Sequence, residues 1–331
     1  MNPVNCIGQV NFGEVLRYYR KREHISQEYL ADGICSREYI IQIEKGGSIP
    51  TLYMIYAFSK RMGINLFDAY AMIVEHNDLD THGKIEKLNE AIALRDDEQA
   101  YRLAVRYSEL PGFSGGVPFQ CIQHAFSLYY SNVLHDYDRS IAYATDGLAA
   151  SGINCPEDIQ PSALTNTDMC LLLVKSVDLC RAGRKEEGRQ YLEALYNNTK
   201  CRILESRYIA NRNRRFDINL LATVTYNLCE FFSDDADRNI HYLEETIQLL
   251  KKFRCDNMWE MLILYKARYL FDQGKPEEAR RLFIAGYYSM LTFSPQESVE
   301  QCARKILQDR LDILHTTGSC SVQDSKKNTV T

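Results

Sequence analysis

Residues 26–46, SQEYLADGICSREYIIQIEKG, determine the fold of the N-terminal part of this chain. The stretch predicts two short helices joined by a tight turn, because Ser26 and Ser36 can each cap the helix that follows them. Gly33 lies where the first helix should end, at a position that favours a residue tolerant of the left-handed conformation. The second helix is expected over residues 37–45. Four apolar side chains can then close over a small core: Leu30, Ile34, Ile40 and Ile43.

The outward face of the second helix carries polar side chains suited to contacts with DNA bases. This spacing leaves Arg37, Glu38, Ile41 and Gln42 facing away from the core. Exposed Arg and Gln near the front of a helix can form bidentate hydrogen bonds with guanine and adenine edges. The segment is therefore predicted to be a recognition helix; the alternative is an ordinary helical hairpin with a solvated face.

Composition is that of an ordinary soluble protein. The chain has 331 residues, of which 45% are hydrophobic and 25% charged, enough for two domains or for one domain and a repeat array. No apolar run approaches the roughly 18 residues of a membrane helix, and the first residues lack a secretory signal, so a cytoplasmic protein without membrane attachment is expected. Eleven scattered cysteines without a CxxC pair argue against a disulfide framework and against a zinc site.

Charge is nearly balanced in the region of the two helices. The whole chain has a net charge of −5, and residues 11–46 contain similar numbers of cations and carboxylates. Attraction to phosphates must then come from grouped cations, and Arg20, Lys21 and Arg22 form the obvious cluster. Weak binding by one copy and reliance on a dimer would follow. The same balance leaves open a third possibility, an interaction scaffold that does not bind DNA.

Flanking segments extend the pair into a five-helix domain over residues 1–75. The pattern resembles the Cro/C1-type (XRE) helix-turn-helix of bacterial and phage repressors. The matching residues are Ser26, Gln27, Leu30, Ala31, Ser36, Ile40, Ile43, Glu44, Gly46, Pro50 and Leu52. The resemblance implies that Gln27 and Ser36 touch phosphates and that the exposed front of the second helix reads bases. It also implies that Glu44 pairs structurally with an arginine of the first helix of the domain, which would be Arg17 or Arg20. The DNA-binding candidates are Gln27, Ser36, Arg37, Glu38, Gln42 and Lys45.

The rest of the chain is predicted to be helical. Residues 76–83, EHNDLDTH, are polar and aperiodic and are expected to be a linker. Residues 84–315 show about five helix pairs with polar turns and a closing helix, and the turn at 273–283, QGKPEEARRLF, resembles a tetratricopeptide turn. The expected fold is all-α, with a tetratricopeptide-like α-solenoid after the helix-turn-helix domain. Residues 316–331 are expected to be a disordered tail.

Signatures of enzyme chemistry are missing from the sequence. It lacks phosphate-binding glycine loops and HExxH, and its seven histidines are spread singly, so we expect no catalytic site, cofactor or metal. Function in the repeats should lie on the concave wall of the solenoid, where side chains with donors and acceptors can hold an extended peptide. The candidate peptide-binding residues are Tyr129, Asn132, Asn166, Asn227 and Arg268.

The two-part layout resembles the RRNPP group of Rgg-, PlcR- and PrgX-like transcription regulators. That resemblance implies a homodimer that places two helix-turn-helix domains on a two-fold site in double-stranded DNA. It also implies that a short signalling peptide binds in the concave groove and controls operator binding, as in quorum sensing. One alternative remains in the same class, an XRE-type repressor whose repeats only dimerise or bind a protein partner.

Overall fold

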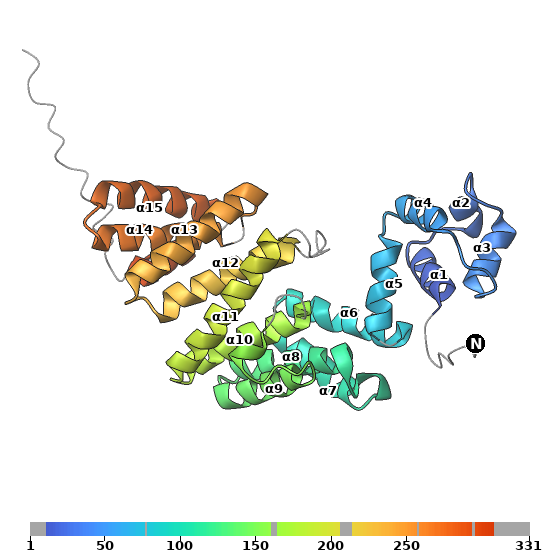
Figure 1. The fold of residues 1–331 in the computed structure, drawn as a ribbon, viewed down its shortest axis with the longest axis horizontal. Helices are drawn as coiled ribbons and strands as arrows, with labels where there is room; N and C mark the ends of the chain where they lie inside the picture. The colour runs from blue at the N-terminus through green and yellow to red at the C-terminus, as the bar shows by residue number, and fades with distance from the viewer. Residues whose placement is uncertain are drawn as a thin grey trace, which may run out of the picture. The chain divides into compact units, whose positions relative to one another are not determined.

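The protein is described here by a computed structural model that covers residues 11–76, 78–159, 164–205, 214–256, 258–292 and 295–307. These residues form α-helices and two short 3₁₀ turns, and no strand occurs among them, so the predicted all-α fold is confirmed (Figure 1). The predicted tail at 316–331 lies outside the described residues. The chain divides into two compact units. Unit 1 consists of residues 1–158 and 164–183, and unit 2 of residues 159–163 and 184–331.

Five helices form the N-terminal domain within unit 1. They are α1 (Phe12–Arg22), α2 (Gln27–Ala31), α3 (Arg37–Glu44), α4 (Leu52–Met62) and α5 (Leu66–Glu75). Each begins at a side chain that accepts a backbone N–H of its first turn: Asn11, Ser26, Ser36, Thr51 and Asn65. Such caps satisfy backbone donors that have no partner inside the helix. Gly33 has a φ of +64°, so the turn between α2 and α3 uses the conformation expected there.

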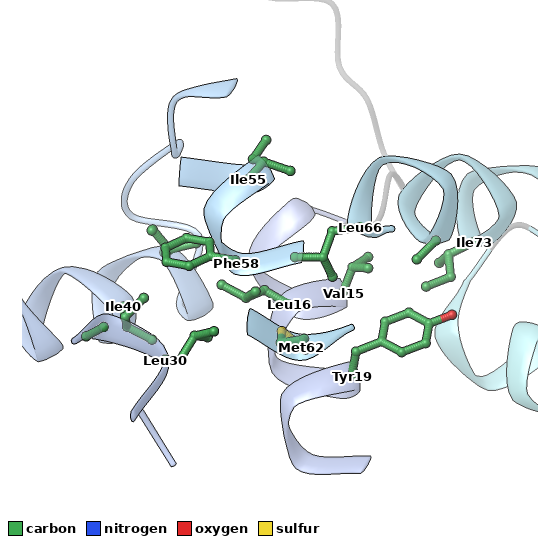
Figure 2. Packing of buried hydrophobic residues seen from close by; sticks show 13 residues of the cluster. Val15, Leu16, Tyr19, Leu30, Ile40, Ile55, Phe58, Met62, Leu66 and Ile73 are labelled. Carbon is green, nitrogen blue, oxygen red and sulfur yellow. The ribbon is translucent and has the colours of Figure 1, made fainter. Parts of the chain in front are cut away.

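The core of this domain gathers apolar side chains from all five helices (Figure 2). Leu30, Ile40 and Ile43 are fully buried as predicted, whereas Ile34 is only partly buried. Full burial of side chains of this size contributes about 1.5–3 kcal/mol each. Helices α1 and α3 also touch through backbone, since a Cβ added at Gly13 would lie 1.7 Å from the carbonyl oxygen of Ile43.

A helix occupies most of the segment 76–83 that was expected to be a linker. Asp78 caps α6 (Leu79–Ala93), and its Oδ1 accepts the backbone N–H of Thr81 at 2.8 Å. The histidines of this segment are buried, with 2.8 Å between the Nδ1 atoms of His76 and His82. The hydroxyl of Tyr19 in α1 lies 3.1 Å from Nε2 of His82. Residues 79–83 are therefore helical, and polar side chains of this segment are packed because they bond to one another.

Burial and ion pairing characterise the contact between α1 and α6. Arg22 and Glu86 form an ion pair at 3.0 Å, and the hydroxyl of Tyr18 donates to Glu86 at 3.3 Å. Burial, with the proximity of His82, lowers the pKa of His76 to about 4. Burial likewise raises the pKa of Tyr19 to about 12. The side chains of His76 and Tyr19 are therefore neutral near pH 7.

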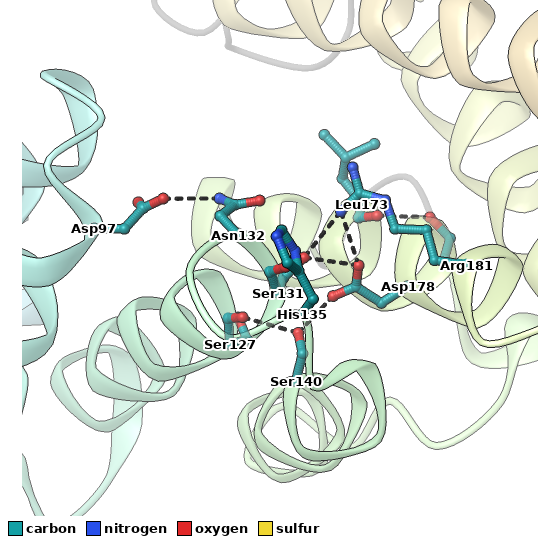
Figure 3. A network of polar contacts seen from close by, with 10 residues as sticks. Asp97, Ser127, Ser131, Asn132, His135, Ser140, Leu173, Asp178 and Arg181 are labelled. Atoms are coloured by element: carbon teal, nitrogen blue, oxygen red, sulfur yellow. Dashed lines mark hydrogen bonds and ion pairs between the residues drawn. The ribbon is translucent and has the colours of Figure 1, made fainter.

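The repeat helices of unit 1 follow α6. They are α7 (Asp97–Ser108), α8 (Gly116–Asn132), α9 (Tyr137–Ala149) and α10 (Asn166–Arg181). Asp178 ties three of these helices together, because its buried carboxylate accepts Ser131 of α8 at 2.8 Å and Ser140 of α9 at 2.6 Å (Figure 3). Arg181 also approaches this carboxylate at 3.2 Å. A buried charge needs such partners to offset its desolvation.

Unit 2 contains the remaining helices. They are α11 (Lys185–Leu204), α12 (Arg214–Phe231), α13 (Ala236–Phe253), α14 (Trp259–Asp272), α15 (Pro276–Leu291) and α16 (Gln296–Leu307). The turn between α14 and α15 has Gly274 at a φ of +75° and Pro276 at the first helical position. Of the five predicted pairs, the third is divided, with α10 in unit 1 and α11 in unit 2. None of the described helices combines the length and apolar character needed to cross a membrane.

Candidate nucleic-acid interface

Helix α3 presents its first turn to solvent. Ser36 accepts the backbone N–H of Tyr39 at 3.2 Å, which fixes where the helix begins. The side chains of Arg37, Glu38 and Gln42 are exposed, as predicted for base-reading residues. The start of α3 is thus defined by its cap, and its polar face is accessible to a groove of DNA.

Two surface contacts position side chains on this face. Nε of Arg37 lies 2.9 Å from Oε1 of Glu28 in α2, with both side chains more than half exposed. The hydroxyl of Ser48 donates to Oε1 of Gln42 at 3.2 Å. Exposed ion pairs contribute only about 0–1 kcal/mol. These contacts orient the side chains of Arg37 and Gln42. Replacing them with contacts to DNA would cost little free energy.

A buried polar network braces α3 from behind. Glu44 accepts two hydrogen bonds from Arg20 of α1, at 2.5 and 3.0 Å, and one from the amide of Gln27 at 2.9 Å. Arg20 also donates to the carbonyl of Ile25 at 2.8 Å. The sequence allowed Arg17 or Arg20 as the partner of Glu44, and the structure selects Arg20. Gln27 is predicted to contact a phosphate. In the structure its side-chain amide donates one hydrogen bond to Glu44, and the residue is half-exposed.

Cations gather beside this network. A depression of about 360 Å³ is lined by Arg17, Arg20, Lys21, Gln27, Ile41, Glu44 and Lys45. Lys45, a predicted DNA contact, is exposed there. The lining also brings in Arg17, which sequence reasoning treated only as a possible partner of Glu44. The sequence contains a signal for this, because Arg17 and Lys21 are four residues apart and therefore lie on the same face of the helix.

The expected cluster of Arg20, Lys21 and Arg22 does not form a common phosphate-binding face. Arg20 is committed to Glu44, and Arg22 pairs with Glu86 in α6 at 3.0 Å. Consecutive residues of a helix point in different directions, so a basic tripeptide cannot present three cations together. Arg20 and Lys21 both line the depression beside Gln27 and Lys45, whereas Arg22 does not.

Two predicted peptide-binding residues lie on α8 in unit 1. Tyr129 stacks on Tyr101 of α7, with ring centroids 4.0 Å apart. The exposed amide of Asn132 donates to Oδ2 of Asp97 at 2.9 Å (Figure 3). Asn166 begins α10, and its Oδ1 is buried without a hydrogen-bond partner. Asn166 therefore has a buried acceptor that no described residue engages.

The two candidates in unit 2 are bonded within that unit. Asn227 donates to the carbonyl of Thr223 in its own helix at 2.8 Å. Arg268 is 8% exposed and donates to the carbonyl of Ile306 in α16 at 3.4 Å. The closing helix α16 thus engages Arg268, and the role of this residue in peptide binding stays a prediction.

Comparisons with known proteins agree with this architecture. Residues 16–68 match the helix-turn-helix family. The fold is similar to that of PlcR from Bacillus thuringiensis, solved in complex with the peptide PapR7 and DNA, at a TM-score of 0.54 and 13% identity over 92% of this chain and 97% of that one. No curated protein sequence matches the chain.

Two further solved structures are similar at lower scores. A putative transcriptional regulator from Listeria monocytogenes EGD-e has a TM-score of 0.46 and 15% identity, over 91% of this chain and 99% of that one. The SHP pheromone receptor Rgg2 from Streptococcus dysgalactiae has a TM-score of 0.47 and 14% identity, over 89% and 99%. Residues 16–68 of this chain thus match the helix-turn-helix family, and the fold of the chain is similar to that of PlcR.

Proposed function

We propose that the protein is a cytoplasmic transcription regulator that reads DNA with α3. One observation carries this proposal: Arg37, Glu38 and Gln42 are exposed on the first turns of a capped helix. The buried bond between Arg20 and Glu44 holds that helix against α1. Arg pairs with guanine and Gln with adenine in the major groove, each good bidentate pair being worth about 1–3 kcal/mol of discrimination.

Backbone contacts would come from the cationic depression and from the two helix starts. Arg17, Lys21 and Lys45 supply charge, while Gln27 and Ser36 supply neutral hydrogen bonds. Three cations in one domain give modest affinity, since each neutralised phosphate adds only about 0.9 to the magnitude of the salt exponent. The proposal therefore includes a homodimer that places two copies of α3 on a two-fold operator.

The repeats are proposed to bind a short signalling peptide that controls operator binding. Support comes from the fold shared with PlcR, whose solved complex contains a peptide and DNA. In this chain, Tyr129 and Asn132 lie one helical turn apart on α8, and Asn166 has an unused acceptor. Asn227 and Arg268 contribute less, since both are bonded inside unit 2.

A second function is favoured by those internal bonds. Asn132 is bonded to Asp97, Asn227 to its own helix, and Arg268 to α16. Side chains satisfied within the chain suit a repressor whose repeats only dimerise or hold a protein partner. The two functions differ in whether a peptide changes DNA binding.

Fluorescence anisotropy with a labelled duplex from upstream of the gene tests the proposal. Synthetic peptides encoded by small reading frames beside the gene are added in turn, and the oligomeric state is followed by sedimentation. Arg37→Ala together with Gln42→Ala should abolish specific binding, and one peptide should shift the apparent Kd. Specific binding that no peptide changes supports the second function. No specific binding by the wild-type protein refutes the DNA-reading role.

A further inference from the structure

Unit 2 contains a depression lined by three arginines, none of which belongs to the candidate sites described above. The first residues of α12 and the end of α13 enclose about 340 Å³. Its lining residues are Arg214, Arg215, Ile218, Phe253, Arg254 and Cys255. Three guanidinium groups therefore share one small space whose lining includes no carboxylate.

None of these arginines has an ion pair with a carboxylate among the described residues. The guanidinium of Arg214 lies over the ring of Phe253, 5.2 Å from its centroid, an arrangement that leaves in-plane N–H donors free. The nearby carboxylate of Asp217 is 2% exposed and is already paired with Arg202 at 3.3 Å. No carboxylate among the described residues thus compensates these three cations.

A second depression in unit 2 shows the ordinary arrangement. It is lined by Lys185, Arg189, Phe231 and Phe232 together with three acidic residues, Glu186, Asp234 and Asp235. Arg189 pairs there with Asp235 at 3.0 Å. Cations that line a depression in this unit can therefore be neutralised locally, and the arginine-lined depression departs from that pattern.

The backbone at Arg254 supports a role for its side chain. This residue ends α13 with a φ of +52°, in the left-handed region that glycine or asparagine adopts more easily. The turn is held by the N–H of Cys255, which donates to the carbonyl of Leu250 at 3.0 Å. The thiol of Cys255 also donates to Oδ1 of Asn219 in α12 at 3.0 Å. Arg254 thus occupies a strained backbone position and shares the depression with two other arginines.

We propose that this depression binds a small organic anion, a carboxylate or a phosphate monoester whose remaining part is apolar. Guanidinium groups hold both kinds of oxyanion through paired hydrogen bonds. Ile218, Phe253 and Cys255 form an apolar floor for the rest of the molecule. A bound anion would connect α12 to α13 and stabilise unit 2 by mass action.

Thermal unfolding and calorimetric titration of the full chain test the site with simple probes. Benzoate and phenyl phosphate supply the two oxyanions, benzamide is an uncharged analogue of benzoate, and sodium chloride matches ionic strength. We expect a saturable rise in Tm with at least one anion and none with benzamide. Response to benzoate alone identifies a carboxylate site, and response to phenyl phosphate alone a phosphate site.

Paired variants locate the binding. Arg215→Gln with Arg254→Asn should weaken anion binding at least tenfold, and asparagine keeps the left-handed turn accessible. Arg280→Gln with Arg281→Gln on α15 removes the same charge elsewhere and should change nothing. Arg215→Gln alone, at an exposed side chain, serves if the double variant lacks the wild-type circular dichroism. Equal response to benzamide, no saturable response to either anion, or undiminished binding by the Arg215 variants would overturn the proposal.

Discussion

Removing the carboxylate behind α3 should destabilise the N-terminal domain far more than removing an exposed one. In Glu44→Ala, the guanidinium of Arg20, whose side chain is 11% exposed, keeps only the carbonyl of Ile25 as a partner. Breaking a buried ion pair from one side costs about 3–5 kcal/mol. Because that carbonyl bond remains, we expect a loss near the lower end, about 3 kcal/mol in the free energy of unfolding.

A matched control exists on the same helix. Arg37→Ala removes an arginine–glutamate pair whose side chains are 52% and 62% exposed, so it should cost less than about 1 kcal/mol. In a double-mutant cycle, Arg20→Ala and Glu44→Ala should be less than additive by at least about 1 kcal/mol. Additive losses would contradict the coupling of the two side chains.

Urea unfolding followed by far-ultraviolet circular dichroism is the suitable assay. The single tryptophan, Trp259, begins α14 in unit 2, so its fluorescence reports on a different unit. Glu44→Ala should shift the dichroism transition more than the fluorescence transition. A loss no larger than that of Arg37→Ala would refute the bracing role of the buried network.

Three further outcomes are expected. Because the folded pKa of His76, about 4, lies below its unfolded value near 6.5, the unfolded chain takes up the proton first as pH falls. Stability should therefore decrease from pH 6.5 towards pH 4 by up to about 1.4 kcal/mol per unit, and His76→Gln should flatten this slope in urea titrations. Lys21→Ala should lower the salt exponent of DNA binding by about 0.9 in anisotropy titrations, whereas Arg22→Ala, which removes a cation bound to α6, should not. Gly13→Ala should cost about 3 kcal/mol or more of unfolding free energy by overpacking α1 on α3, whereas Gly83→Ala in α6, with its nearest contact at 3.7 Å, should be neutral or stabilising.

Local rules accounted for much of the N-terminal domain. The caps Ser26 and Ser36 and the turn at Gly33 follow from the backbone needs of single residues, so the sequence predicts them well. Glu44 also follows, because its spacing resembles a known helix-turn-helix pattern. Choosing Arg20 over Arg17 needed the three-dimensional contact between α1 and α3.

Long-range packing explains what sequence reasoning missed. In the basic tripeptide, Arg20 pairs with a residue of α3 and Arg22 with a residue of α6. Counting charges in the sequence cannot reveal these contacts. Residues 76–83 were predicted to be a linker because they are polar and aperiodic, yet His82 is buried against α1. Arg268 was predicted to bind a peptide on the concave wall, and in the structure it donates to a carbonyl of α16. In each case the deciding partner lies in another helix.

Selection of bound sequences from a random duplex DNA library shows whether α3 reads DNA bases. With the wild-type chain, we predict an enriched motif with two half-sites about one helical turn apart, as two copies of α3 require. Arg37→Ala with Gln42→Ala should lose that motif while keeping weak, salt-sensitive binding through Lys21 and Lys45. Enrichment of the same motif by the double variant, or of no motif by the wild type, would contradict the assignment of α3 as the DNA reader.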